Sequence, residues 1–367
     1  MASAGLPAPI KRPGIGVLAV EGREFEVERN EQLVRLFPSI AVFTRSNNKF
    51  ADVDLRRALS TVQNIPALIL QGRFSVRTQQ QQVLRTIGIP HGDIPLIPEL
   101  SDFIPDVVCV RPAESGDIEV RPDGTRVEVN DLTEQRLALT IFDIKHTAEA
   151  NPSYCSEIAM YALMLANWIH QDSQLQQRYF VTSSAYLWTR VRQGDSQLDA
   201  LERQGGATTT DLLAALRADS EDAQLRFYLA AVKGFFEDVV RVVRVGTARE
   251  DGWTDLDWHI SGSCSSCDWL GDRRHMGAND RLVVDANPNH YCMSLAEASG
   301  HLCLVPGITR GAKKVLQRHT VTDTAALSGA LGHPAFQEHT LLKREARALP
   351  ARSTAIRTGN LSNDATG

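Results

Sequence analysis

The chain lacks the features of a membrane or secreted protein. None of its 367 residues belongs to an apolar run of the roughly 20 residues that span a bilayer. Residues 1–7 contain no apolar signal-peptide core. A net charge of −5 excludes a protein whose whole surface is basic. We therefore expect a cytoplasmic protein without membrane contact, and any nucleic acid would bind a confined basic groove with moderate, salt-sensitive affinity.

Cysteine is also scarce, with six residues, and none precedes Cys109. Four of the six fall in one C-terminal window: Cys264, Cys267, Cys292 and Cys303. Without a secretory signal, such a cluster indicates metal ligation rather than disulfides. Four thiolates bind Zn²⁺ or hold a [4Fe–4S] cluster. In place of Cys303, the fourth ligand could be one of His275, His290 and His301, and reduced thiols in a helical domain remain the alternative.

An ordered set of polar residues stands out in the first half of the chain. Asp106 lies in an apolar stretch typical of a buried strand, residues 103–110. Asp143 and Lys145 end a second apolar stretch, residues 137–145. Glu157 and Tyr161 follow on a predicted helix, residues 153–172, where i and i+4 share a face.

These residue types suit metal-assisted cleavage of a phosphodiester. Asp106 and Asp143, with the backbone carbonyl of Ile144, could bind Mg²⁺ or Mn²⁺, hard cations that prefer oxygen ligands. Lys145 lies on the same side of its strand as Asp143, because side chains alternate with period two. It could orient or deprotonate the attacking water and offset charge on the phosphate. The alternative is a salt bridge between Asp143 and Lys145 at a sheet edge, with Tyr161 in an ordinary core.

The order Pro-Asp, Asp-x-Lys and an acid or glutamine four residues before tyrosine resembles the PD-(D/E)xK nucleases. More narrowly it resembles the RecB-like family related to the CRISPR-adaptation nuclease, in which glutamine is usual at the position of Glu157. The resemblance implies a restriction-endonuclease-like α/β core, a mixed central sheet flanked by helices, with a helical cysteine-containing C-terminal module. It favours an iron–sulfur cluster over zinc, and it makes His91 and Glu99 outside candidates for the site.

The implied function is a Mg²⁺-dependent deoxyribonuclease acting on single-stranded DNA or duplex ends in repair, recombination or antiviral defence. A helicase or another defence or repair subunit would be its partner. Glu157 and Tyr161 would hold the DNA strand, with a water-mediated metal contact as a second role for Glu157. Two alternatives stay open: a non-catalytic DNA-binding or scaffold subunit of a helicase–nuclease complex, and a restriction-type endonuclease on the same core.

Beyond the cysteines, residues 304–327 resemble a helix–hairpin–helix segment. A glycine-containing turn there would offer backbone N–H groups to a DNA phosphate. Residues 306–357 carry nine Lys or Arg against three Asp or Glu, which suits contacts with a DNA backbone. A solvated helical pair that simply packs on the core is the alternative.

The expected organisation has four parts. A nuclease core spans residues 1–200, a helical connection 201–260, the cysteine cluster with the helical hairpin 261–345, and a flexible tail 346–367. Within them we expect a strand at 14–20 with a short segment to 27, a helix at 32–37, a hairpin at 117–129, a strand or hairpin at 178–188 and a polar linker at 194–210.

Overall fold

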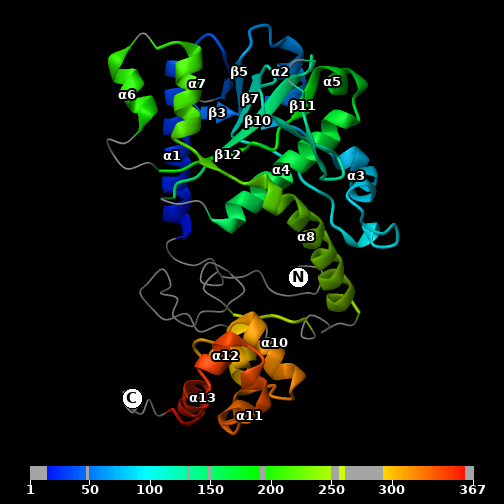
Figure 1. The fold of residues 1–367 in the computed structure, drawn as a ribbon, viewed down its shortest axis with the longest axis vertical. Helices are drawn as coiled ribbons and strands as arrows, with labels where there is room; N and C mark the ends of the chain where they lie inside the picture. Colours follow the sequence, from blue (N-terminus) through cyan, green and yellow to red (C-terminus); the bar gives the residue numbers. More distant parts are fainter. Residues whose placement is uncertain are drawn as a thin grey trace. The chain divides into compact units, whose positions relative to one another are not determined.

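The computed structural model describes residues 15–46, 49–130, 133–147, 151–190, 196–205, 207–248, 256–260 and 292–359, with the side chains of 15–20 excepted. The chain divides into two compact units. One is Leu18–Trp253, and the other combines Met1–Val17 with Thr254–Gly367. Figure 1 shows the elements of both. In the described part of the chain, no helix is long and apolar enough to cross a membrane.

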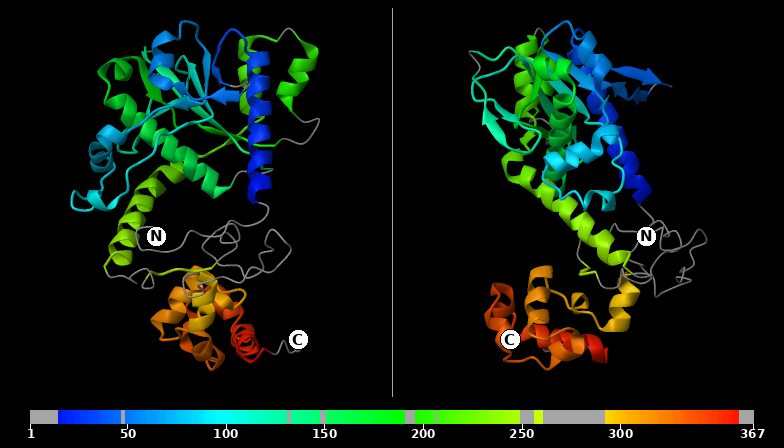
Figure 2. Two further views of the ribbon diagram at one scale, coloured as in Figure 1. Left: turned by 180° about the vertical axis from the view of Figure 1, so that it is seen from behind. Right: turned by 90° about the vertical axis from the view of Figure 1, so that its right-hand side faces the viewer.

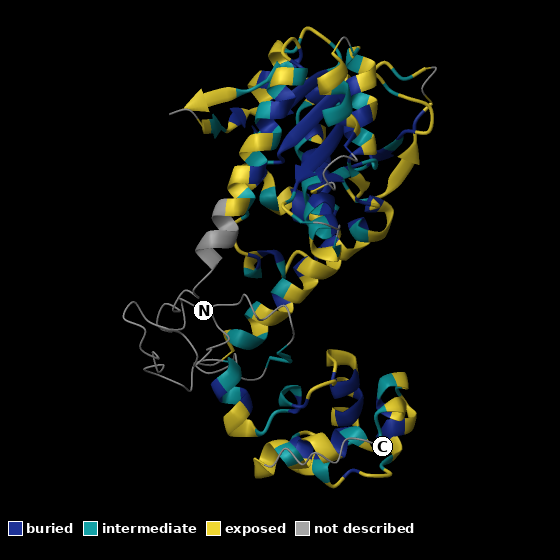
Figure 3. Ribbon diagram, turned by 90° about the vertical axis from the view of Figure 1, so that its left-hand side faces the viewer, coloured by how far each residue is buried: buried dark blue, intermediate teal, exposed yellow. Residues whose placement is uncertain are grey.

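A mixed sheet forms the centre of the first unit. Its order is β1 (Ala41–Val42), β5 (Ala67–Leu70), β7 (Val107–Arg111), β10 (Leu137–Ile144), β12 (Tyr186–Trp188) and β13 (Glu221–Asp222), and β11 (Tyr179–Val181) also pairs with β10. The β1–β5, β10–β11 and β10–β12 pairs are parallel, and β5–β7, β7–β10 and β12–β13 are antiparallel. Figure 3 shows the central strands as the most buried part of this unit.

Helices cover both faces of the sheet, as Figure 2 also shows. One face packs against α2 (Leu55–Thr61), α3 (Gln80–Thr86), α4 (Pro152–His170), α5 (Ser173–Arg178) and α8 (Leu225–Gly246). The other packs against α1 (Ile15–Leu36), α6 (Gln197–Gln204) and α7 (Thr209–Ala218). Neighbouring strand residues divide between the faces as the period of two requires: Val108 belongs to the first core and Cys109 to the second. The mixed α/β class with a sheet flanked by helices is confirmed.

Short elements complete the first unit: β2 (Thr44–Ser46), β3 (Lys49–Ala51), β4 (Val53–Asp54), β6 (Gly72–Arg73), β8 (Ile118–Val120) and β9 (Arg126–Glu128), with 3-10 turns at Arg77–Gln79 and Ile94–Leu96. The β8–β9 pair confirms the hairpin expected at 117–129, and Gly124 adopts the positive φ of 84° that its turn requires. At 178–188, β11 and β12 both run parallel to β10, so this segment is an interrupted strand and not a hairpin.

The N-terminal expectation was wrong. Residues 15–36 form one helix, α1, where a strand and a separate short helix were predicted. The apolar run at 15–20 has the composition of a strand, but a short apolar run alone cannot distinguish a strand from part of a buried helix. Phe25 and Leu33 decide the outcome, because both are buried against the sheet from one continuous helix.

The predicted polar linker at 194–210 was also wrong, because α6 occupies residues 197–204. Ser196 caps this helix by accepting from Asp199 N, and its hydroxyl donates to Asp219. The Asp219 carboxylate also accepts from the backbone N–H groups of Gln197 and Leu198. Long-range capping of this kind satisfies helix N-terminal donors that local sequence leaves open.

The second unit is helical and has its own apolar core. It contains α9 (Cys292–Ser299), α10 (Arg310–Arg318), α11 (Thr324–Ser328), α12 (Thr340–Arg344) and α13 (Ala348–Thr358), with 3-10 turns at Leu302–Leu304 and Pro334–Gln337. The prediction of a flexible tail from residue 346 was therefore wrong for residues 348–358, which form α13. The α13 helix buries Leu349 and Ser353, and the Ser353 hydroxyl donates to the carbonyl of Thr324 in α11.

Candidate functional site

Two aspartates meet at neighbouring strand ends in the first unit. Asp106 directly precedes β7, and Asp143 is the penultimate residue of β10. These strands are antiparallel with Phe142 opposite Val107, and extending that register by one residue places Asp143 opposite Asp106. The side chains contact each other, and Asp106 Oδ2 also accepts a 2.6 Å hydrogen bond from Ile144 N. Ile144, expected to contribute its carbonyl, thus contacts Asp106 through its N–H.

Both carboxyl groups are removed from water, with residue exposures of 9% for Asp106 and 2% for Asp143. Burial raises the pKa of Asp106, against the opposing effect of the Ile144 N–H. Burial, and then the charge of Asp106, raise the pKa of Asp143 well above its usual range. Two buried carboxyls this close cannot both ionise without a compensating cation.

Lys145 supplies one positive charge beside this pair. Its Nζ lies 2.9 Å from Asp143 Oδ2 and 3.1 Å from Glu157 Oε2. Burial opposes the charge on Lys145, but Asp143 and Glu157 outweigh that effect and raise its pKa. The side chain is therefore an ammonium group at neutral pH and can donate hydrogen bonds or offset negative charge.

Helix α4 brings the last two predicted residues to this point. Asn151 caps the helix by accepting from Ser153 N and Tyr154 N, and Pro152 occupies the first turn. One turn on, Glu157 accepts a 3.2 Å hydrogen bond from the Tyr161 hydroxyl. Burial and the Glu157 charge raise the pKa of Tyr161, which keeps its hydroxyl protonated. All five side chains selected from the sequence therefore meet in one place.

The sequence interpretation missed two further residues, Glu26 and Gln71. The Gln71 amide donates to Glu26 Oε1 at 2.8 Å and to Asp106 Oδ1 at 3.0 Å, so it holds both carboxylates. Gln71 has a φ of 54°, and its backbone N–H donates to the carbonyl of Asp106. Burial and then Asp106 raise the pKa of Glu26 to about 7. Gln71 was detectable as the first polar residue after an apolar strand, whereas Glu26 lay in the short segment to residue 27, where no helix was expected.

The donor set fits a hard divalent cation. Asp106 and Asp143 offer only oxygen atoms, as Mg²⁺ and Mn²⁺ prefer. Burial raises the pKa of both carboxyl groups, and the charge of Lys145 does not offset that effect. Among the described residues, no three His, Cys, Asp or Glu side chains already form a group that could hold an ion. The donor set is thus the aspartate pair, with Glu26 held beside it through Gln71.

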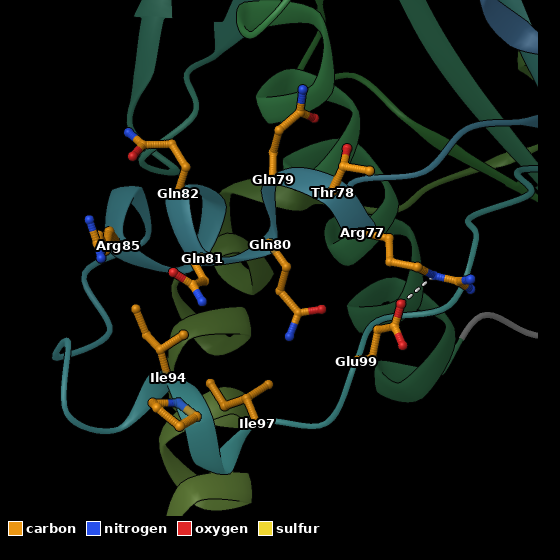
Figure 4. Close-up of a pocket in the computed structure, with 11 residues that line it drawn as sticks. Arg77, Thr78, Gln79, Gln80, Gln81, Gln82, Arg85, Ile94, Ile97 and Glu99 are labelled. Carbon is orange, nitrogen blue, oxygen red and sulfur yellow. Dashed lines mark ion pairs between the residues drawn. The ribbon is translucent and has the colours of Figure 1, made fainter.

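The structure places His91 and Glu99 elsewhere. Glu99 forms a 3.0 Å ion pair with Arg77, and both line a separate hollow at the start of α3 (Figure 4). His91 contacts Arg85, which lines the same hollow. Neither Asp106 nor Asp143 lines it. These contacts give the two outside candidates partners of their own.

The predicted cysteine cluster is described only in part. Cys264 and Cys267 lie outside the described residues, as do His275 and His290. Cys292 begins α9, and Cys303 lies in the following 3-10 turn. His301 accepts from the backbone N–H of Cys303 and stacks on Trp258, with ring centroids 4.3 Å apart. The two cysteines outside that cluster, Cys109 and Cys155, are buried.

The hairpin segment keeps its predicted turn but not all of its basic surface. Gly307, in the turn before α10, has a φ of 92°. On α10, Lys313 is 1% exposed, and its ammonium group donates to Asp257 and to the carbonyl of Trp258. Lys314 and Arg318 remain exposed. Lys313 therefore stabilises the fold of this unit and is withdrawn from the basic face.

Comparison with protein-family models, curated proteins and solved structures found no match.

Proposed function

We propose that this protein is a metal-dependent DNA nuclease. The observation that carries the proposal is the convergence of Asp106, Asp143 and Lys145 at adjoining strand ends. The order of elements supports a restriction-endonuclease-like core of the RecB-like type. In chain order these elements are helix α1, strands β5, β7 and β10, helix α4 and strand β12. A mixed sheet with the second acidic strand at its centre agrees with that assignment.

Each residue has a role in hydrolysis. Asp106 and Asp143 would hold Mg²⁺ or Mn²⁺. The Gln71 amide holds the carboxylate of Glu26 beside Asp106, where it would support the bound cation. A bound cation supplies Lewis acidity and lowers the pKa of a water ligand. In the reaction, a water oxygen bonds to phosphorus, the ester P–O bond breaks, and the leaving oxygen takes up a proton. The Lys145 ammonium offsets the charge that develops on the phosphoryl oxygens.

Glu157 and Tyr161 act on this centre from α4. Glu157 and Asp143 both contact the Lys145 ammonium group, and the Tyr161 hydroxyl donates to Glu157. Fixing an ammonium group before the reaction avoids the cost of orienting it during the reaction. We assign Glu157 and Tyr161 the positioning of Lys145 and contact with the substrate strand.

The test is cleavage of end-labelled single-stranded and duplex DNA with Mg²⁺, Mn²⁺ or EDTA. We expect cleavage with either cation and none with EDTA. Asp143→Asn should abolish it, whereas Asp257→Asn, in the second unit, should not. Metal-dependent cleavage that survives Asp143→Asn would refute the site. On plasmid DNA, a smear supports the RecB-like reading and discrete bands support a restriction enzyme.

The C-terminal cysteines carry a separate proposal, an iron–sulfur cluster that stabilises the second unit. Thiolates hold such clusters, and binding free energy then becomes folding free energy. Purified protein should be brown and contain iron. Colourless protein with stoichiometric zinc would replace the cluster by a zinc site and leave the nuclease proposal unchanged.

A further inference from the structure

An apolar hollow lies beside the candidate site, between helices α4 and α8. Its volume is about 350 Å³. Glu157, Met160 and Tyr161 line it from α4, and Ala231, Val232 and Phe235 line it from α8. The two helices pack directly against each other, so the hollow has a fixed frame.

Phe235 gives this hollow an exposed aromatic wall. Its side chain belongs to a residue that is 53% exposed, unusual for a ring so large. The ring makes an edge-to-face contact with the ring of Phe236, at a centroid separation of 5.5 Å, and Phe236 is 1% exposed. An aromatic ring open to solvent provides a stacking surface for a flat ligand.

The hollow is continuous with the catalytic groups. Glu157 contacts Lys145 at 3.1 Å through Oε2, and Oε1 accepts from the Tyr161 hydroxyl. The residues that position Lys145 are therefore also a wall of the hollow. A phosphodiester bound at Asp143 and Lys145 would bring a neighbouring nucleotide to its mouth.

We propose that the hollow binds an unpaired base of the substrate strand, next to the phosphodiester that is cleaved. A base has two apolar faces, which suit Met160, Val232 and Phe235, and a polar edge. Ser153 and Ser156 from α4 also line the hollow. The Ser156 hydroxyl donates to the carbonyl of Pro152, so it offers that edge an acceptor oxygen, and Ser153 offers a hydroxyl group. Stacking on aromatic rings is the usual way in which proteins hold unpaired bases without reading sequence.

This inference, which rests on the proposed nuclease function, defines the substrate class. A paired and stacked base cannot enter the hollow without leaving the duplex, which costs free energy. Single-stranded nucleic acid and frayed ends avoid most of that cost. We therefore infer a preference for unpaired strands over blunt duplex ends.

The test compares Phe235→Ala with Phe227→Ala. Both residues are exposed on α8, at 53% and 61%, but only Phe235 lines the hollow. Phe235→Ala should raise the KM for a single-stranded oligonucleotide roughly 5- to 100-fold, the range expected for the loss of one stacked base. An oligonucleotide made of abasic nucleotides has no ring to stack on Phe235, so its KM should be the same for Phe235→Ala and wild type. Phe227→Ala should behave as wild type in both assays. Phe235→Trp, which keeps an aromatic ring in the hollow, should have the wild-type KM.

A binding assay separates failure of this inference from failure of the nuclease proposal. In EDTA, wild-type protein should quench the fluorescence of an oligonucleotide that contains 2-aminopurine, and Phe235→Ala should not. Quenching without cleavage by the metal-loaded wild type would reject the nuclease and keep the base site. If Phe235→Ala and Phe227→Ala both quench as wild type does, the base site is wrong, whether or not DNA is cleaved. Where DNA is cleaved, an unchanged KM for Phe235→Ala gives the same result.

Discussion

Two shielded lysines, one in each unit, show how similar ion pairs can serve different ends. Lys145 lies at 2.9 Å from Asp143, and Lys313 donates to Asp257 and to the carbonyl of Trp258. Each ammonium group is held between an aspartate and a second acceptor. By residue type alone, both are ordinary Lys–Asp ion pairs.

The balance of charge around the two lysines differs. Near Lys145, the carboxyl groups of Asp143, Asp106 and Glu157 affect a single ammonium group. Near Lys313, the single carboxylate of Asp257 also pairs with Arg310 and Lys314. Burial disfavours the charge on Asp257, yet the ammonium groups of Lys313 and Lys314 outweigh it and lower its pKa. Burial, and then the charge of Asp106, instead raise the pKa of Asp143. An excess of buried carboxylates favours a bound cation, and an excess of cations does not.

The sharpest test of this contrast replaces each aspartate with its isosteric amide. Asp143→Asn should lower the rate of DNA cleavage at least ~100-fold, the size of effect typical for loss of one electrostatic contact to a transition state. Asp257→Asn should leave the rate per folded molecule unchanged. Cleavage assays with equal amounts of folded protein, verified by circular dichroism, measure both. An equal loss of cleavage rate in the two variants would show that Asp143 and Asp257 do not differ in their role in cleavage.

The lysines should show the opposite pattern in stability. Lys313→Met leaves Asp257 and the Trp258 carbonyl without their shared donor, which should cost about 1–3 kcal/mol of unfolding free energy. Urea denaturation of the second unit measures this cost. Lys145→Met should abolish cleavage, while Lys313→Met should leave the cleavage of a small diester intact. A catalytic defect in Lys313→Met would place that residue in the reaction.

A smaller effect should come from Glu26. Its pKa of about 7 in the folded protein is above the ordinary 4.5, so its contribution to stability is full below pH 4.5 and is lost as pH rises through 7. Thermal unfolding in EDTA should show this loss, and Glu26→Gln should reduce it. The same variant should bind Mn²⁺ roughly tenfold more weakly, as for other supporting ligands. An unchanged pH profile and affinity would exclude Glu26 from the site.

The smallest effect should appear around Lys313. Burial, and then the charge of Lys313, lower the pKa of His301 to about 4 from the ordinary 6.5. The sign is opposite to that of Glu26: His301 contributes stability above pH 6.5, and this is lost as pH falls toward 4. Protonation would also end the hydrogen bond that its Nδ1 accepts from Cys303 N. The free energy of unfolding of the His301→Gln variant should therefore fall less between pH 6.5 and 4 than that of wild type. The same pH dependence in both proteins would contradict this account.

Much of the sheet and of the site could be predicted from local pattern. The strand that carries Asp143 and the helix that carries Glu157 and Tyr161 have strong sequence patterns, and the structure has both. Prediction from local pattern failed at α1, where the apolar run is compatible with either a strand or a helix. It also failed at α6, because Asp219, which caps this helix, lies 21 or more residues away in the sequence. Glu26 was lost with the first of these errors.

The sequence by itself determined the residue types and the order in which they occur: two aspartates, a lysine two residues beyond the second, and a helix with an acid and a tyrosine. Their alternation along a strand fixed the side shared by Asp143 and Lys145. Only the tertiary structure decided which charges face one another. The β7–β10 register sets Asp106 opposite Asp143, and Gln71 brings Glu26 beside them. Register and helix packing depend on contacts between distant residues, and the electrostatic balance of the site follows from them.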